Sequence, residues 1–133
     1  MKKTFKFIIL ILLIYGCGKK DLPVPPLQIQ VQKVTDLKGS LYGDILKIEW
    51  TIPDKKIKGF MIYKSKNPMN IPKCDTCPLT FQRIAFIPIL YSSTNRMSFS
   101  EKIEKGYNMI YKVIVVSEKG DLSEDSNYIT FSF

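Results

Sequence analysis

Three cysteines are the most reactive side chains in this sequence of 133 residues, which contains no histidine. Cys17 stands alone after an apolar run, whereas Cys74 and Cys77 form a CxxC pair inside "IPKCDTCPLTF". Without histidine, Ser-His-Asp and Cys-His nucleophilic sites and histidine-based zinc sites are excluded. The chemistry open to this chain is therefore thiol chemistry: acylation at Cys17, and oxidation or metal binding at the pair.

Residues 1–16 have the pattern of a signal peptide. A basic start is followed by the apolar run "FIILILLI", and the small Gly16 lies directly before Cys17. This is the order of a basic region, a hydrophobic region and a cleavage site. As a helix, residues 5–15 would rise only about 16 Å, whereas the hydrocarbon core of a bilayer is about 30 Å thick. The run is therefore too short for a membrane span.

The four residues "IYGC" at 14–17 resemble the lipobox of bacterial lipoproteins. The resemblance implies that Cys17 becomes the mature N-terminus and carries acyl chains on its sulfur and its amine. Each buried CH₂ group contributes roughly 0.8 kcal/mol, so several acyl chains would hold the protein at the membrane permanently. We expect a lipid-anchored cell-envelope protein, and Gly18 favours the periplasmic side of the outer membrane in a Gram-negative cell. The alternatives are a cleaved soluble protein and an uncleaved amphipathic anchor.

Residues 17–26 form the expected tether, ending in "LPVPP". Prolines fix their own φ and extend the residue before them, so ten residues at about 3.1 Å each would span up to about 30 Å. The stretch also resembles the N-terminal motif of lipoproteins that assist lipopolysaccharide-transport assembly. The matching residues are Cys17, Gly18, Lys20 and Leu22, followed by the prolines. This resemblance implies an alternative function that depends on the tether.

The pair Cys74 and Cys77 has three possible roles. Outside the cytosol, cysteines this close are normally oxidised, and we favour a structural disulfide that closes a small ring in a loop. A redox-active pair usually has its first cysteine at a helix N-terminus, and the neighbouring prolines Pro72 and Pro78 offer no helix. A zinc site needs two further soft ligands. Thiol-disulfide exchange and metal binding remain alternatives.

The composition indicates one domain and argues against other site classes. Removing residues 1–26 leaves about 107 residues, enough to bury roughly two thirds of the unfolded surface. Without Lys2, Lys3 and Lys6, the mature chain has 17 basic and 12 acidic residues, a net charge of +5. The lysines are dispersed, so no nucleic-acid footprint is expected. No Gly-rich phosphate loop or Ca²⁺ loop pattern is present, and the sequence gives no evidence that two carboxylates converge in a pocket. We expect no catalytic residue, no cofactor and no metal.

Apolar residues from position 27 onwards recur with a period of two, which is typical of strands. Seven segments have this pattern: "LQIQVQ" (27–32), "ILKIEW" (45–50), "GFMIYKS" (59–65), "FQRIAF" (81–86), "RMSFS" (96–100), "MIYKVIVVS" (109–117) and "YITFSF" (128–133). No window has convincing helical periodicity. The pattern predicts an all-β sandwich or small barrel over residues 27–133.

Residues 27–133 resemble a fibronectin type III domain of the immunoglobulin-like class. The motifs are "LKIEWTIP", "KGFMIYKS" and "EKIEKGYNMIYKVIVVSEKGDLSEDSN". The resemblance implies a seven-stranded sandwich with the family's landmark residues at Trp50, Ile103, Gly106, Tyr111, Val113, Val115, Gly120, Ser123 and Ser126. One departure is that the family's corner tyrosine falls on Met109, and Tyr111 is the nearest substitute.

We therefore expect a lipid-anchored, non-catalytic module that binds or scaffolds an envelope protein. Trp50 shares a face with Leu46 and Ile48, which favours a core position over a carbohydrate platform. Four tyrosines are candidates for a partner surface: Tyr42, Tyr63, Tyr91 and Tyr107. The C-terminal strand is a further candidate, as an edge that could accept an added strand. The sequence does not specify the partner.

Overall fold

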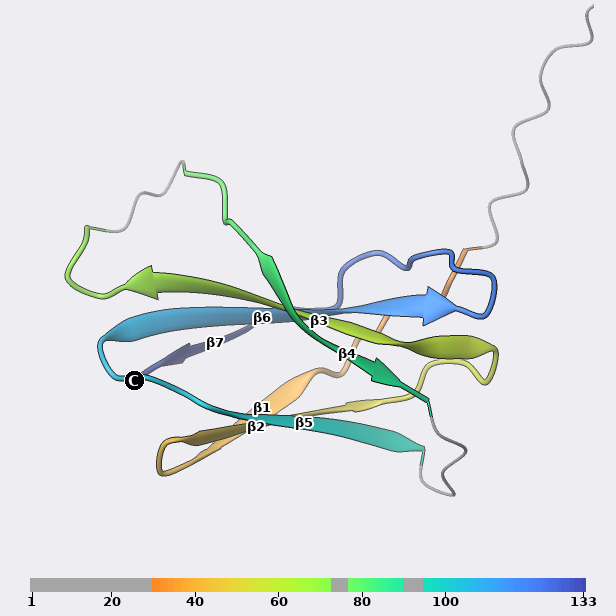
Figure 1. The fold of residues 1–133 in the computed structure, drawn as a ribbon, viewed down its shortest axis with the longest axis horizontal. Helices are drawn as coiled ribbons and strands as arrows, with labels where there is room; N and C mark the ends of the chain where they lie inside the picture. Colours follow the sequence, from red (N-terminus) through yellow and green to blue (C-terminus); the bar gives the residue numbers. More distant parts are fainter. Residues whose placement is uncertain (1–29, 73–76, 90–94) are drawn as a thin grey trace, which may run out of the picture.

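Two antiparallel sheets face each other in the computed structural model, which describes residues 30–72, 77–89 and 95–133 (Figure 1). One sheet has three strands in the order β1-β2-β5, and the other has four in the order β4-β3-β6-β7. The strands are β1 (Lys38–Tyr42), β2 (Ile45–Thr51), β3 (Ile57–Pro68), β4 (Gln82–Pro88), β5 (Arg96–Lys102), β6 (Tyr107–Ser117) and β7 (Ile129–Ser132). The fold is an all-β sandwich, as the sequence predicts.

The alternating residues of β2, β3 and β6 form the core between the sheets. Trp50, Phe60 and Tyr111 are fully buried, and the Trp50 and Phe60 rings meet edge to face with centroids 5.2 Å apart. The predicted inward positions are confirmed as buried: Leu46, Ile48, Ile62, Met109, Val113 and Val115. Burial of large apolar side chains on facing strands holds the sheets together.

The first predicted strand is wrong in the part that the structure describes. Residues 30–32 have no strand geometry, and β1 lies instead at residues 38–42. Residues 30–37 are held by side chains, because Thr51 donates its backbone N–H and hydroxyl to Asp36 at 3.0 and 2.6 Å. Asn127 likewise bonds both backbone groups of Leu37, at 2.9 Å each. These bonds take the place of a strand ladder.

Side-chain hydroxyls also accept hydrogen bonds from backbone N–H groups at the edge of β6, in the part of the strand that β7 does not cover. Ser126 accepts the N–H of Val113 and Ser123 accepts that of Val115, both at 2.9 Å, and both serines are buried. The chain joins β6 as a regular strand only from Ile129. The two serines that the family resemblance singled out therefore have a clear structural role.

Candidate binding face

The predicted lipidation and disulfide sites fall largely outside the described residues. Cys17 and Cys74 are both outside, so acylation and the pairing of Cys74 with Cys77 stay predictions. Cys77 lies within the described residues and lines a groove between the β3–β4 connection and the strands β6 and β7. Within the described ranges, no cluster of three His, Cys, Asp or Glu side chains could hold a metal ion. These same ranges contain no helix long and apolar enough to cross a membrane.

The aromatic candidates divide into core and surface. Trp50 is buried, which confirms its core position and removes it as a carbohydrate platform. Tyr42 is 68% exposed at the β1–β2 turn. Tyr63 and Tyr107 are half-buried, and Tyr91 is outside the described residues. Of the predicted surface tyrosines, Tyr63 lies in the largest aromatic cluster.

The outer face of the four-stranded sheet is unusually apolar. Register places Phe86, Met61 and Ile114 side by side across β4, β3 and β6. The Phe86 side chain is 41% exposed, and the other two are half-buried. A further row across β3, β6 and β7 contains Ile110 and Thr130. The solvent face of an antiparallel sheet normally carries polar residues, so this face differs from a simple solvated surface.

A lysine lies among aromatic rings in the middle of this face. The Lys112 ammonium is 4.5 Å from the centroid of Phe81 and 5.5 Å from that of Tyr63, and its side chain is only 15% exposed. It also pairs with Asp125 at 2.9 Å. Tyr128 stacks on Phe81 with centroids 5.7 Å apart. Cation–π contacts and an ion pair between the covered Lys112 and the 37% exposed Asp125 thus fix the cluster.

The Asp125 carboxylate stays ionised within this cluster. Burial by itself raises the pKa of Asp125, but hydrogen bonds from Lys112 and Tyr128 outweigh it and leave the pKa below the usual value. The Tyr128 hydroxyl donates to Asp125 at 2.7 Å, and this bond raises the pKa of Tyr128. Lys112 and Tyr128 thus both stabilise the ionised form of Asp125.

A groove of about 560 Å³ adjoins the cluster. Its floor is the outer face of β6 and β7, including Asn108, Ile110 and Thr130, and its wall is the described part of the β3–β4 connection. Two wall residues, Ile71 and Leu79, are 61% and 47% exposed. Apolar side chains left in contact with water beside a concave surface are typical of an interaction site.

A second polar cluster links the two sheets on their inner side. Lys64 on β3 pairs with Glu101 on β5 at 2.9 Å, and the two side chains are 21% and 18% exposed. The Tyr111 hydroxyl donates to the same Glu101 carboxylate, and not to backbone as in the family's tyrosine corner. Burial and this bond raise the pKa of Tyr111 well above its usual value. Tyr111 thus stabilises the sandwich as a neutral donor.

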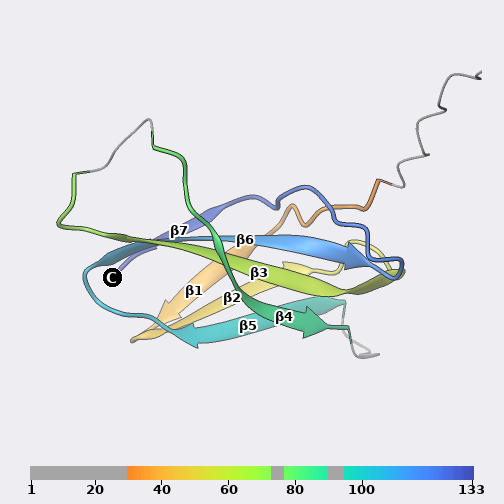
Figure 2. The same cartoon turned by 45° about the horizontal axis from the view of Figure 1, so that its top comes forward.

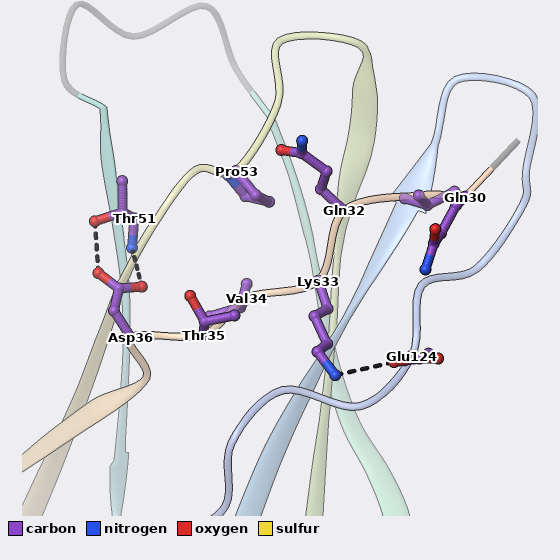
Figure 3. Close-up of a pocket in the computed structure, with 10 residues that line it drawn as sticks. Gln30, Gln32, Lys33, Val34, Thr35, Asp36, Thr51, Pro53 and Glu124 are labelled. Atoms are coloured by element: carbon purple, nitrogen blue, oxygen red, sulfur yellow. Dashed lines mark hydrogen bonds and ion pairs between the residues drawn. The ribbon is translucent and has the colours of Figure 1, made fainter.

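Another groove, of about 800 Å³, lies beside residues 30–36 (Figure 3). Its charged groups are paired: Asp36 accepts from Thr51, and Lys33 contacts Glu124 at 2.9 Å (Figure 3). The side-chain and backbone bonds from Thr51 hold the pKa of Asp36 below its usual value. An ionised, doubly bonded carboxylate is a poor general acid or base.

Comparisons of the sequence with known protein families and with curated proteins give no match. The structure is similar to a Fn3-like protein from Clostridium thermocellum, with a TM-score of 0.52, 16% identity, and coverage of 74% of this chain and 88% of that one. This similarity gives the chain a fibronectin type III-like fold, as the sequence resemblance implied.

Parts of two larger proteins have similar folds. Pectate lyase PelI from Erwinia chrysanthemi matches with a TM-score of 0.53 and 23% identity over 77% of this chain and 28% of its own. A beta-1,2-glucanase from Parabacteroides distasonis matches with a TM-score of 0.53 and 24% identity over 77% of this chain and 13% of its own. The chain thus spans only a fraction of these enzymes, and the likeness concerns the fold alone.

Sequence reasoning missed this outer face. The signal was present, because β3 and β6 carry apolar residues at both phases of the alternation: Met61 and Tyr63 alternate with Phe60 and Ile62, and Ile114 lies between Val113 and Val115. Strands apolar at both phases are typical of sheets covered on both sides. Which part of the face would be covered depends on the β3–β4 connection, which the pattern does not reveal.

Proposed function

We propose that this chain is a lipid-anchored, non-catalytic binding module of a bacterial cell envelope, and that an envelope protein contacts the outer face of its four-stranded sheet. The observation that carries the proposal is the apolar character of this face around Phe86, Met61 and Ile114. Exposed apolar patches with a polar surround are typical of protein-binding surfaces.

The state of the charged groups supports a non-catalytic role. Six carboxylates of the described residues form ion pairs with lysines: Asp44, Glu49, Glu101, Glu104, Glu124 and Asp125. Asp36 is bonded to Thr51. A general acid or base needs a free proton site directed at a substrate, and a carboxylate in a lysine pair lacks one. The pectate lyase and the glucanase are only 23% and 24% identical to this chain and are matched over only 28% and 13% of their own lengths, so their activities are not carried over.

The two ends of the sandwich are arranged as expected for a protein that is anchored at one end and binds at the other. Gln30, where the described chain begins, lies at the end of the sandwich that holds Pro53 and the β2–β3 connection (Figures 1 and 2). The β3–β4 connection, which walls the groove of Ile71 and Leu79, lies at the opposite end (Figures 1 and 2). An anchor at Cys17 would hold the first end, leaving the groove directed away from the membrane.

Photo-crosslinking in cells tests the proposal. In the full-length protein, Phe86→Asp should lower recovery of a crosslinked envelope protein at least tenfold, because a buried interfacial charge without a partner is costly. Tyr42→Asp is the matched control: it is an equally drastic change of an exposed aromatic residue on the other sheet. Equal recovery from both variants, or equal loss, would refute a partner on the four-stranded face.

Two further variants separate the anchor and the thiols from this face. Cys17→Ala removes the lipid and should abolish recovery of the partner from membranes, while leaving the isolated interaction in detergent intact. Cys74→Ser combined with Cys77→Ser should leave recovery unchanged. Because Cys77 lines the groove, the decisive comparison is with Phe86→Asp: if the double serine variant abolished recovery while Phe86→Asp did not, the thiol pair and not the four-stranded face would carry the function.

A further inference from the structure

We propose that β7 is a pairing edge for a second copy of this chain, joining two four-stranded sheets into one continuous sheet. This inference goes beyond the proposed partner face, because it concerns the edge of the sheet and a different occupant. It begins from the hydrogen-bond pattern of β7, which leaves alternate backbone groups directed away from β6.

The register defines which backbone groups are free to pair. Tyr107 and Phe133 exchange both backbone bonds, at 3.3 and 3.2 Å. In an antiparallel ladder the bonded pairs alternate, so Phe131 and Ile129 also direct their backbone groups at β6. Thr130 and Ser132 therefore direct theirs to the open side. The two side chains are exposed, which agrees with an uncovered edge.

The four edge strands differ in how they resist unwanted pairing. β4 contains Arg83, ends at Pro88 and has a register shift against β3. β5 carries three charged residues: Arg96, Glu101 and Lys102. β1 begins with Lys38. In contrast, β7 reads "ITFS", with no charge, proline, glycine or register shift. Charges, prolines and bulges protect many sheet edges, and β7 lacks all three; its one protection is its length of four residues, the shortest of the seven strands.

The rigidity of β7 also suits pairing. On its inner side, the Phe131 ring lies so close to Gly39 that a Cβ atom there would come within 2.5 Å of the ring. Glycine at position 39 thus lets β1 hold the inner face of β7. The strand is fixed from one side, whereas no strand of the described residues pairs with its outward edge. A preorganised edge loses little conformational entropy when another strand adds to it.

A second copy fits this edge because the strand is self-complementary. With a two-fold axis at Thr130, its backbone groups bond those of Thr130 in the other copy, and Ser132 lies opposite Tyr128. No like charges face each other, and threonine pairs across strands are favourable. Pairing over so few residues is weak in dilute solution. Anchoring both copies in one membrane would raise their effective concentration, as linkage does in multivalent binding.

Disulfide trapping in cells tests the edge directly. In full-length protein with Cys74→Ser and Cys77→Ser, Thr130→Cys should form a covalent dimer, because bonded antiparallel pairs have Cα atoms about 5.5 Å apart, within disulfide range. Gln82→Cys on the exposed edge of β4 is the matched control and should yield at least tenfold less dimer. Equal yields from the two positions, or adducts with another protein in place of dimers, would overturn self-pairing.

A charge-swap experiment keeps the test independent of the disulfide. Thr130→Lys and Thr130→Glu each place like charges at the two-fold axis, so each alone should raise the dissociation constant of detergent-solubilised full-length protein at least tenfold in analytical ultracentrifugation. Mixing the two variants should restore the dimer as a Lys-Glu pair. If the mixture remains monomeric while unchanged protein dimerises, β7 is not the interface. Thr130 also lines the groove of the proposed partner face, so the two proposals are distinguished by Phe86→Asp, which lies on the opposite edge strand and should leave the dimer unchanged.

Discussion

The outer faces of the two sheets differ in which side chains they carry and in how exposed the charged ones are. On the three-stranded sheet, Lys38, Glu49 and Ser98 form one row, and Ser40, Lys47 and Ser100 form the next. The Lys47–Glu49 pair there is open to water, with side chains 42% and 38% exposed. On the four-stranded sheet, apolar rows surround Lys112, which is only 15% exposed. One face is solvated, whereas the other is packed.

The difference between the two faces indicates which ion pairs contribute most to the free energy of unfolding. An exposed pair is screened by water and salt and contributes about 0–1 kcal/mol. A covered pair has lost hydration, so removing one partner leaves an uncompensated charge. The four-stranded sheet contributes a covered lysine to each of its faces, Lys112 outward and Lys64 inward. We therefore expect mutations of its charge clusters to have larger effects than mutations on the three-stranded sheet.

Tyr111→Phe should give the largest effect. The substitution removes the hydroxyl that bonds Glu101 and leaves the covered Lys64–Glu101 pair without its third member. Loss of a hydrogen bond to a charged group costs roughly 1.5–3 kcal/mol in unfolding free energy. Urea denaturation of the full-length protein measures this loss. A change below about 0.5 kcal/mol would show that the covered cluster stabilises no more than a surface pair.

Lys112→Ala should come next, compared directly with Lys47→Ala. The first removes the contact with Asp125 and the cation–π contacts with Phe81 and Tyr63. We expect a loss of about 1–2 kcal/mol for Lys112→Ala and less than about 0.5 kcal/mol for Lys47→Ala. Denaturation in low and high salt sharpens the contrast, since salt screens the exposed pair more strongly. Equal losses would contradict the difference between the faces.

Much of the inner architecture could be predicted from sequence, because burial imposes a period of two. Residues such as Ile48, Trp50 and Val113 mark the inner face without reference to any other part of the chain. β1 escaped prediction because Gly39 and Ser40 interrupt the alternation, and all but one of its residues are exposed. The strand exists only because β2 pairs with it.

The apolar phase of β3 and β6 was visible in the sequence, but the charged and aromatic cluster on the candidate face could not be predicted, because it depends on contacts between distant segments. Phe81 precedes β4 and Tyr128 precedes β7, so their stacking over Lys112 requires the correct order of strands in the sheet. Asp125 joins them from a stretch without regular strand geometry. Periodicity identifies which side of a strand faces the core, but not which loop residues cover the other side.

Protonation of Asp125 on acidification should produce the smallest of these effects. The pKa of Asp125 is below its usual value in the folded protein, so ionisation of Asp125 stabilises the fold above the unfolded pKa, near 4. As the pH falls through the folded pKa, the carboxylate is protonated and this contribution is lost. Urea midpoints should therefore decrease between pH 5 and pH 3, by less in Asp125→Asn than in the unchanged protein.

Glu49→Gln on the solvated face is the control. The pKa of Glu49 is also below its usual value, mainly because Lys47 donates a hydrogen bond to it. If Glu49→Gln flattened the pH dependence as much as Asp125→Asn, coverage by the aromatic cluster would add nothing to the ion pair.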